Sequence, residues 1–479
     1  MSELFPSLIP NSRRVGRAVW RAVRCIGRGL RKVGRAMLYI LPALVLIHLI
    51  AVVVTGRQLQ GDIDRLTKAG ILAPVKDLIP TLPPGAENAA DVYQQAWREL
   101  RLSAEDESVL FDQYAKHDAN WFALARRVVA ANPEYYRLVD RASRMTHCVF
   151  PVDWEPMFSA SFPHLSQMRR AARMLALRSY VDAADGRIDS ALASVAAVFR
   201  VGEQAKTDPV IIAELVSYGI QAIGVRALED VLPTGVPSPA ACRSLYDRLA
   251  RTDNLTSSAR AVKSEAVLMG MDVFDWVRSG RISITEVISS NSGQVATGRR
   301  PRLLVRLHSW LWRPFLNADQ RIYLSFMEKE VRAFERPWPE SRDTTAELSA
   351  WLGPGAPFYA VLTRAVMPIY GRAVESRDRA TAAIGTARIA LALKAYRADH
   401  PAYPASLAEL ETMGWKLPPN PFGGKPYRYR REGAGFVVWS IGPDMRDQNA
   451  SIDYEIWLKT KSQKGWEEGE YDIVFRAKR

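Results

Sequence analysis

Cysteine is scarce in this 479-residue chain, which contains only Cys25, Cys148 and Cys242. No two of them have the close spacing of a C-x-x-C pair, so the sequence does not predict a metal site built on thiolates. A disulfide between Cys148 and Cys242 is one alternative if both lie in an oxidising compartment. Two buried free thiols are the other, and we favour it because the sequence supplies no geometry for a bond.

Motifs of known catalytic chemistry are also absent. The six histidines are scattered, none is followed by another four residues later, and no H-E-x-x-H, G-x-S-x-G, Walker A or G-x-G-x-x-G pattern occurs. Asp153, Glu155 and His164 lie close in sequence around Trp154, but such groups are common on protein surfaces. The sequence therefore predicts no catalytic residue and no cofactor, although a site assembled from distant residues would leave no motif.

Acidic residues are nearly missing from the first 36 positions. Glu3 stands there against nine basic residues, which gives +8 of the total net charge of +14 and leaves +6 for the rest of the chain. The basic residues are Arg13, Arg14, Arg17, Arg21, Arg24, Arg28, Arg31, Lys32 and Arg35. Because the excess charge belongs to one short segment, we expect no nucleic-acid partner for the body of the protein.

Residues 36–55 (AMLYILPALVLIHLIAVVVT) carry no formal charge. A helix of this length crosses a hydrocarbon core of about 30 Å, and the basic residues before it predict a cytoplasmic N-terminus. The run is too long for a usual signal peptide, and no A-x-A site follows it. We therefore expect a single-pass protein of the inner (cytoplasmic) membrane, with about 420 residues on the far side.

Within the basic segment 1–35, basic and apolar residues recur at steps of three and four between positions 13 and 35. This spacing predicts an amphipathic helix that lies on an anionic lipid surface. A solvated charge run that only sets the membrane topology is the alternative.

Beyond the membrane segment, residues 56–85 predict a connector that ends in Pro80, Pro83, Pro84 and Gly85. Residues 86–340 have mostly helical apolar spacing and predict an all-helical domain. Within it, residues 289–302 (SSNSGQVATGRRPR) predict a loop. The aromatic and basic stretch 303–316 (LLVRLHSWLWRPFL) fits core packing, an interfacial membrane contact or a partner site, and we favour core.

One helical hairpin is predicted more specifically. A helix breaks at Asp185-Gly186, and Ile188 and Ala191 open the next helix three residues apart. This spacing resembles the turn between the two helices of a tetratricopeptide repeat. The resemblance covers about 35 residues, and no second copy follows at the repeat period.

Residues 341–479 predict a small α+β domain. A long helix runs from after Pro368 to about His400, and strand-like alternation then begins at Tyr427. Residues 436–439 and 472–475 predict two further strands. The fold class is therefore mainly α: a transmembrane helix, a helical central domain, and one helix on a short antiparallel sheet.

This domain carries a set of short motifs: Ala395-Tyr396, Tyr403-Pro404, Asn420-Pro421-Phe422-Gly423-Gly424-Lys425-Pro426-Tyr427, Tyr429 and Trp439-Ser440-Ile441-Gly442-Pro443-Asp444. They resemble the globular head of the major pseudopilin of type II secretion and of related pilins. The whole ectodomain also looks like a family of uncharacterised bacterial envelope proteins. The membrane helix has no glutamate near its start and some 300 residues precede the head, so we expect neither pilin processing nor polymerisation.

The resemblance also implies a metal site. In some pseudopilins, the loop after the Ser-x-Gly-x-Asp stretch binds calcium, and the corresponding loop here offers Asp444, Asp447, Asn449 and Asp453. Calcium takes about six to eight oxygen ligands. An ordinary acidic surface loop is the alternative, because the loop lacks a glycine-rich run and residues 456–469 separate it from the last strand.

The sequence thus favours a non-enzymatic, membrane-anchored envelope protein that binds other proteins or acts as a scaffold. An accessory component of a type II secretion or pilus-like system is the second hypothesis. A hydrolase of envelope material, with its site in the helical domain, is the third.

Overall fold

The computed structural model describes residues 12–112, 117–155, 160–291, 302–351, 355–367, 370–464 and 470–477. Its first helices are α1 (Ser12–Lys68), α2 (Val75–Leu78), α3 (Ala89–Glu99), α4 (Ala104–Leu110), α5 (Ala119–Ala131), α6 (Pro133–Arg144), α7 (Pro163–Ala184), α8 (Ile188–Ala205), α9 (Ile211–Val231) and a 3-10 turn, η2 (Leu232–Thr234). Next come α10 (Pro239–Ala250), α11 (Asn254–Glu265), the π-helical η3 (Ala266–Met271), α12 (Asp272–Arg278), α13 (Ile284–Asn291), α14 (Arg302–Phe334), α15 (Arg342–Trp351), α16 (Val361–Val366) and α17 (Tyr370–Asp399). The chain ends with α18 (Ala408–Thr412), β1 (Arg428–Glu432), β2 (Gly435–Ser440), α19 (Tyr454–Lys464) and β3 (Ile473–Ala477).

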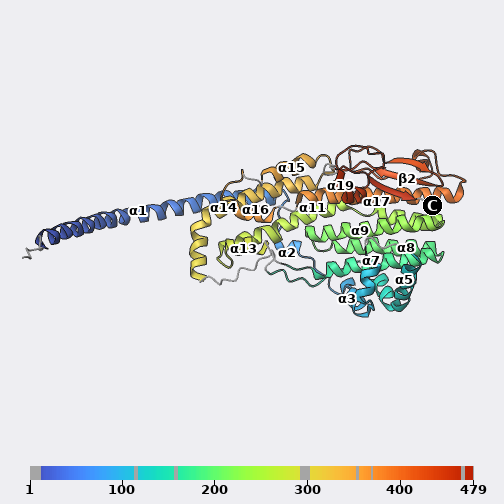
Figure 1. Ribbon diagram of the computed structural model, residues 1–479, viewed down its shortest axis with the longest axis horizontal. Helices are drawn as coiled ribbons and strands as arrows, with labels where there is room; N and C mark the ends of the chain where they lie inside the picture. Colours follow the sequence, from blue (N-terminus) through green and yellow to red (C-terminus); the bar gives the residue numbers. More distant parts are fainter. Residues whose placement is uncertain are drawn as a thin grey trace, which may run out of the picture.

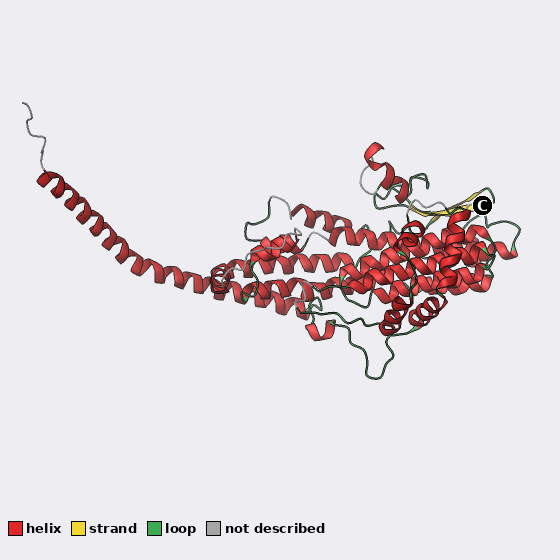
Figure 2. Cartoon of the chain, turned by 60° about the horizontal axis from the view of Figure 1, so that its bottom comes forward, coloured by secondary structure: helices red, strands yellow, loops and turns green. Residues whose placement is uncertain are grey.

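The expected fold class is confirmed: the protein is mainly α, with an N-terminal apolar helix and a small C-terminal antiparallel sheet. α1 projects from one end of the body, and most other helices run along the long axis (Figure 1). The three strands lie on one side of the helices (Figure 2).

α1 is longer than the predicted membrane helix. It is continuous from Ser12 to Lys68. None of the residues in its most apolar 18-residue stretch, within 37–68, is buried by the rest of the protein. The expectation that a connector begins at residue 56 is wrong for its first part, because α14 packs along the end of α1. Asn317 donates a hydrogen bond to Thr55 (3.1 Å), Arg321 pairs with Asp62 (2.7 Å), and Arg65 pairs with Glu328 (2.8 Å).

A second helix, α9, is also long and apolar enough to cross a membrane, but most of its apolar window is buried inside the body. α7 and α8 form the predicted hairpin beside it, with Gly186 in the turn at a φ of 78°. Such a positive φ is cheap only for glycine. Ile188 and Ala191 are buried, as the hairpin needs, and α9 packs as a third layer.

The boundary expected at residue 340 does not separate two hydrophobic cores. One core joins Leu192, Leu228 and Leu245 of the helical region to Leu391 of α17 and Phe436 of β2. α17 packs against α9, α10 and α11, because its apolar residues occur all round the helix rather than on one face. The C-terminal part therefore folds onto the helical region and is not a separate unit.

The C-terminal sheet has the order β1-β2-β3, with both pairs antiparallel. Its strands start and end within a few residues of the predicted ones. Phe436, Val438 and Phe475 are buried in the same core as α17. Tyr427, just before β1, contacts Gly385 of α17 so closely that a Cβ at this glycine would overlap the tyrosine hydroxyl.

The Asn420 motif has a structural role. The Asn420 side chain accepts hydrogen bonds from the Phe422 N–H (3.1 Å) and the Ser440 hydroxyl (2.7 Å), which ties the motif to the end of β2. Gly423 and Gly424 follow with φ values of 75° and 62°. The glycines are therefore explained by a left-handed turn rather than by a ligand.

The stretch 303–316 is not core at its beginning. Leu303, Leu304, Leu307 and Leu311 are all exposed, and the first buried apolar residue of the stretch is Leu316. The core interpretation is thus wrong for the first turns of α14. Most of the loop expected at 289–302 lies outside the described residues.

We expect Gly385→Ala to destabilise the protein. The new methyl group must displace the buried Tyr427 ring, and overpacking of this kind costs about 1–3 kcal/mol, against a gain of about 1 kcal/mol in helix propensity. Gly219→Ala in α9 is the matched control, because nothing lies within 4 Å of its added Cβ. Thermal melts of the two variants check this: equal melting temperatures would contradict the close contact.

The stability of the body should fall as pH rises toward neutrality. Burial raises the pKa of Glu330 in α14 to about 7, and its Oε2 atom has no hydrogen-bond partner. In the unfolded chain a glutamate titrates near 4.3, so the folded state binds more protons between about pH 4 and pH 7. This stabilisation is complete below the unfolded pKa and is lost as pH rises through the folded pKa, at about 1.4 kcal/mol per pH unit.

Melting temperatures of wild type and Glu330→Gln between pH 5 and pH 8 measure this effect. The variant keeps the shape of the side chain and removes its titration, so its curve should be flatter. Parallel curves for the two proteins would show that Glu330 is already ionised in the folded state.

Candidate functional site

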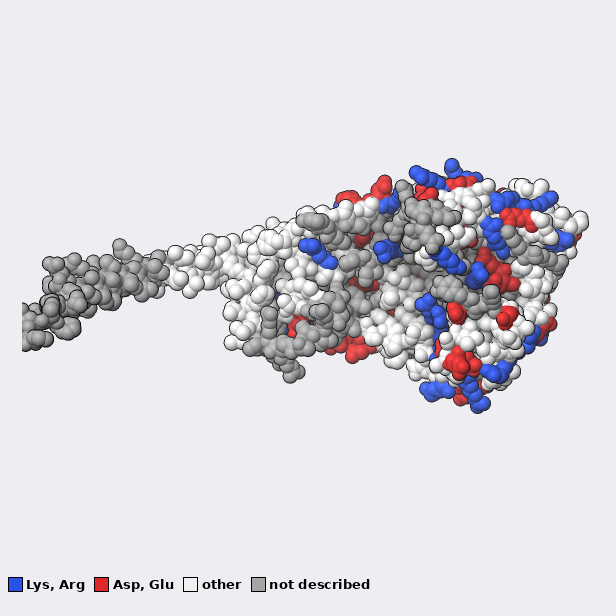
Figure 3. All heavy atoms as spheres, viewed as in Figure 1, with Lys and Arg blue, Asp and Glu red and all other residues white. Residues whose placement is uncertain are grey.

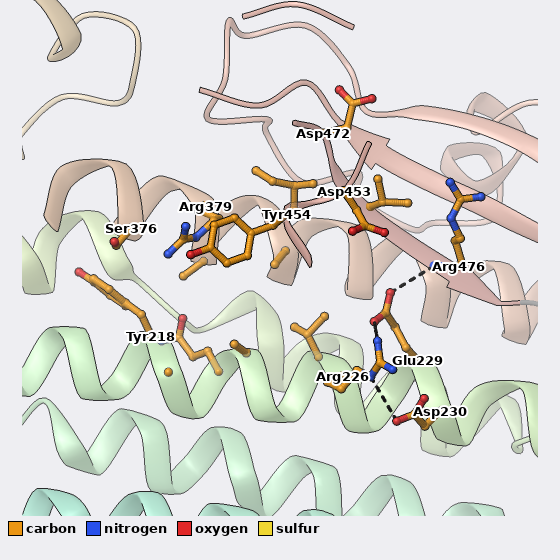
Figure 4. Close-up of a pocket in the computed structure, with 18 of the residues that line it drawn as sticks. Tyr218, Arg226, Glu229, Asp230, Ser376, Arg379, Asp453, Tyr454, Asp472 and Arg476 are labelled. Carbon is orange, nitrogen blue, oxygen red and sulfur yellow. Dashed lines mark hydrogen bonds and ion pairs between the residues drawn. The ribbon is translucent and has the colours of Figure 1, made fainter. Parts of the chain in front are cut away.

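A groove lies between α9, α17 and the sheet, with a cavity volume of about 670 Å³ (Figure 4). Its walls come from segments that are far apart in the sequence. α9 forms one wall, α17 the other, and β3 with the start of α19 closes one side.

The α9 wall changes character along the helix. Leu215, Gly219, Ala222 and Val225 supply small and apolar surface. At the C-terminal end of the helix, Arg226 pairs with Glu229 (3.9 Å) and Asp230 (3.4 Å). The same helix therefore offers an apolar floor and a charged end.

The α17 wall is a stripe of residues at helical spacing: Ser376, Arg379, Ala380 and Ala383. The small side chains leave the space that forms the groove. The Arg379 guanidinium lies 4.2 Å from the centre of the Tyr454 ring and donates a hydrogen bond to the Tyr471 hydroxyl (3.4 Å). That hydroxyl in turn donates to Glu375 (2.9 Å), so the arginine is held in place by protein partners.

The third side of the groove is the outer edge of β3. The Arg476 backbone N–H points away from β2 and donates to the Glu229 carboxylate (3.3 Å). The Arg476 side chain bonds Glu432 (3.2 Å) and the Ala450 carbonyl. α9 thus covers this end of the exposed strand edge, which protects it from pairing with another chain.

Asp472 lies where the groove meets the predicted calcium loop. Burial raises the pKa of Asp472 to about 7, although the N–H groups of Ala450 and Gln448 donate to its carboxylate and lower the pKa. The charges of Asp447 and Asp444 raise the pKa of Asp472 further.

The four predicted calcium ligands are close along the loop, but each has a protein partner. Asp447 pairs with Arg428 and accepts the Trp439 N–H (2.9 Å). Asp444 accepts the Gln448 amide (2.6 Å), Asn449 accepts from Arg430 (2.8 Å), and Asp453 accepts the Ile456 N–H in the first turn of α19 (2.8 Å).

These hydrogen-bond and ion-pair partners change the pKa of Asp447 in the loop. Burial alone would raise the pKa of Asp447, but Trp439, the Asn449 N–H and Arg428 together lower it. Among the residues that the structure describes, no three His, Cys, Asp or Glu side chains are grouped so that they could hold a metal ion. The loop is therefore held by an arginine and by backbone amides.

The residues weighed for acid–base catalysis are not brought together. Asp153 is exposed and accepts the Glu155 N–H (3.0 Å), whereas His164 is buried and binds Asp208 (2.6 Å between Nε2 and Oδ2). The His164 ring stacks on Phe150, at 4.3 Å between ring centres. No pattern in the sequence points to Asp208, because it lies between α8 and α9, 44 residues after His164.

Cys148 and Cys242 are both free and buried, and they lie in different hydrophobic cores. Burial raises the pKa of each thiol to about 12, and the charge of Asp208 adds to the effect at Cys148. A thiol with such a pKa stays protonated near neutral pH, so Cys148 is not an activated nucleophile. The free-thiol alternative is confirmed.

The groove itself was missed by sequence analysis. Its only signals are the small residues spaced three and four apart in α17 and the combination of glycine, alanine and charge in α9. Both patterns are common in packed helices, so neither predicts that the two helices stand apart at these positions.

No family model matches the chain, and no curated protein or solved structure is significantly similar to it. The resemblances to pseudopilin heads and to a tetratricopeptide hairpin therefore stay predictions.

We expect calcium to leave the melting temperature of the full chain unchanged. Asp447 would have to give up Arg428 and Trp439 to bind the ion, and Asp453 would have to release the first turn of α19. Thermal melts in about 10 mM calcium, roughly ten times the Kd of the weakest extracellular sites, with magnesium and a chelator as controls, test this. A calcium-specific increase would restore the predicted site; Arg428→Ala, which frees one carboxylate, is the variant for comparison.

Proposed function

We propose that this protein is a membrane-anchored envelope protein that binds a partner protein through the groove between α9, α17 and β3. The role is one of interaction rather than catalysis. The observation that carries the proposal is the groove itself, which combines an apolar floor with charged residues of both signs at its rim.

The anchor supports this placement. α1 presents an exposed apolar surface of membrane-spanning length, and a helix with that surface is stable only when lipid or protein covers it. The basic residues between positions 13 and 35 precede it. By the positive-inside rule, the N-terminus lies in the cytoplasm, on the anionic lipid of the inner membrane, and the body lies outside the cytoplasm.

The chemistry of the groove favours a polypeptide. Interfaces between proteins typically have an apolar centre enriched in aromatic residues and arginine, with a polar rim. The floor of the groove is apolar and is formed in part by Leu215, Ala222 and Ala383. Tyr454 and Arg379 lie beside these residues. One apolar side chain of a partner could insert there while neighbouring charges of the partner meet Arg226, Glu229 or Asp230.

The C-terminal fold favours a second candidate, an accessory component of a type II secretion or pilus-like system. The helix α17 under a three-stranded antiparallel sheet has the arrangement that the resemblance to pseudopilin heads implies. This candidate differs from the first only in the identity of the partner protein. The crosslinking experiment below distinguishes the two candidates, because it identifies that partner.

A photo-crosslinking amino acid at Ala222 tests the proposal in intact membranes. Ala222 is exposed on the groove side of α9, so a bound partner should be crosslinked there. Ala193, exposed in the middle of α8 and outside the groove, is the matched position and should capture nothing specific.

A second substitution separates groove binding from chance collision. Ala380→Trp fills the opposite wall and should reduce the Ala222 crosslink by about tenfold, the effect expected when roughly 1.4 kcal/mol of binding is lost. An Ala222 product unaffected by Ala380→Trp, or equal products at Ala222 and Ala193, would contradict the groove as the binding site. Secretion or pilus proteins in the specific product would favour the second candidate.

A further inference from the structure

The first turns of α14 expose a row of leucines to solvent. We refer to residues 302–313 as the α14 arm, which precedes Pro314 inside the same helix. Leu303 is 77% exposed and Leu307 53%, and Leu304 and Leu311 are similarly uncovered. These positions recur every three or four residues, so they form one apolar face of the arm. An uncovered face of this size is unusual for a soluble surface.

The other side of the arm packs against the body. Ser309 is only 3% exposed, and a Cβ at Gly280 would lie 2.7 Å from Cγ of Arg306. The contacts of Ser309 and Arg306 thus hold the arm, and with it the leucine face, in a fixed position. Only a surface outside the described body could cover it.

The arm lies at the end of the body from which α1 projects. It runs across the direction of α1, whereas the rest of α14, after Pro314, runs along the body (Figure 1). A proline inside a helix removes a hydrogen bond and permits such a bend. A helix that crosses the membrane axis in this way lies parallel to the bilayer surface.

Contacts with α1 fix the depth of the arm. The ring of Trp310 lies 4.3 Å from the ring of His48, between their centres, and Asn317 contacts Thr55 at the end of the apolar run. His48 precedes Thr55 by seven residues, which corresponds to about 10 Å along a helix. Interfacial amphipathic helices are buried about 5–10 Å into the boundary between headgroups and acyl chains. The arm is therefore at the level expected for such a helix.

The residues around the arm match a membrane interface. Trp312, Phe315 and Phe358 form a chain of ring contacts at 5.4 and 5.7 Å, and Phe358 is 71% exposed. Aromatic residues gather at the headgroup level of membranes. Between residues 302 and 318 the chain has three arginines and no acid. On the face in Figure 3, the described surface beside α1 is also nearly free of charged side chains.

We propose that the α14 arm is an interfacial membrane helix that lies in the leaflet on the body's side of the bilayer. Its leucines enter the acyl boundary, and Arg306 and Arg313 reach phosphate groups. The partner is lipid, because the leucine face continues the uncovered apolar surface of α1 through Trp310 and His48. With α1 and the arm both in the bilayer, the body can neither tilt nor turn freely about its anchor. This proposal rests on the proposed membrane span of α1, but it does not depend on the proposed function of the groove.

Depth-dependent quenching of a fluorescent label tests it in the full-length protein. A single cysteine, Leu307→Cys, is labelled with an environment-sensitive dye in a Cys25→Ser background, in which Cys148 and Cys242 remain buried and unreactive. The protein is placed in nanodiscs of phosphatidylcholine and phosphatidylglycerol that contain a lipid spin-labelled near the headgroup. Quenching of about twofold or more, with a blue-shifted emission, is the expected result for an interfacial residue.

Val236→Cys is the matched control, since Val236 is an exposed apolar residue (62%) in the segment between η2 and α10. This segment follows α9, whose Glu229 contacts Arg476 close to the C-terminus, and the C-terminus lies at the end of the body opposite α1 (Figure 1). Equal, weak quenching at Leu307 and Val236 would overturn the proposal. So would Leu307→Cys protein that escapes quenching but forms disulfide-linked dimers, because a second copy of the chain would then cover the face. Both substitutions are at exposed positions, so neither should impair folding, and unchanged melting temperatures verify that.

Discussion

The side chain of Arg377 is completely buried, and its charge is balanced by the neighbouring Asp378. The guanidinium donates to the carbonyls of Phe334, the last residue of α14, and of Arg336, two residues later (2.7 Å each). Asp378 accepts the Trp338 N–H (2.8 Å), and the Trp338 indole donates to the Pro443 carbonyl (3.0 Å). Losing one partner of such a pair leaves a buried charge and costs about 3–5 kcal/mol, so this junction constrains everything attached to it.

Two long helices meet at this junction. α14 holds the anchor, because Asn317, Arg321 and Glu328 bind the end of α1. α17 starts from the same point and supplies both a wall of the groove and the support of the sheet. Ser376 of the groove is the residue next to Arg377. The position of the groove relative to α1 is therefore set by a continuous path of packed helices and buried hydrogen bonds.

Much of the local structure could be predicted from the chain. The uncharged run 36–55, the break at Asp185-Gly186 and the alternation after Tyr427 each produced the expected element, because apolar periodicity and turn residues act over a few positions. The Asn420 motif marked a real turn, although its glycines satisfy a left-handed backbone rather than a ligand. The loop with Asp444 and Asp447 looked like a cation site because the sequence does not reveal that Arg428 of β1 and amide groups of the loop itself bind these carboxylates.

Other features could not be predicted, because they depend on which surfaces meet. Apolar residues occur on all faces of α17, which indicates that the helix is buried but not that it joins the helical region and the sheet in one core. The leucines of 303–316 have the spacing of a core helix, and only their place beside α1 shows that no protein covers them. Similarly, His164 forms a hydrogen bond with Asp208, 44 residues away, and not with Asp153 or Glu155, which lie closer in the sequence.

The sequence by itself determined the fold class of the protein, its apolar N-terminal helix and the order of its elements, since hydrophobicity, charge and backbone preference are properties of short segments. The tertiary structure alone decided the contact of the arm with α1, the shared cores and the groove. Each of these is a relation between residues far apart in the chain, as in the contact of Asn317 with Thr55, 262 positions apart, and no local pattern encodes the distance between two surfaces.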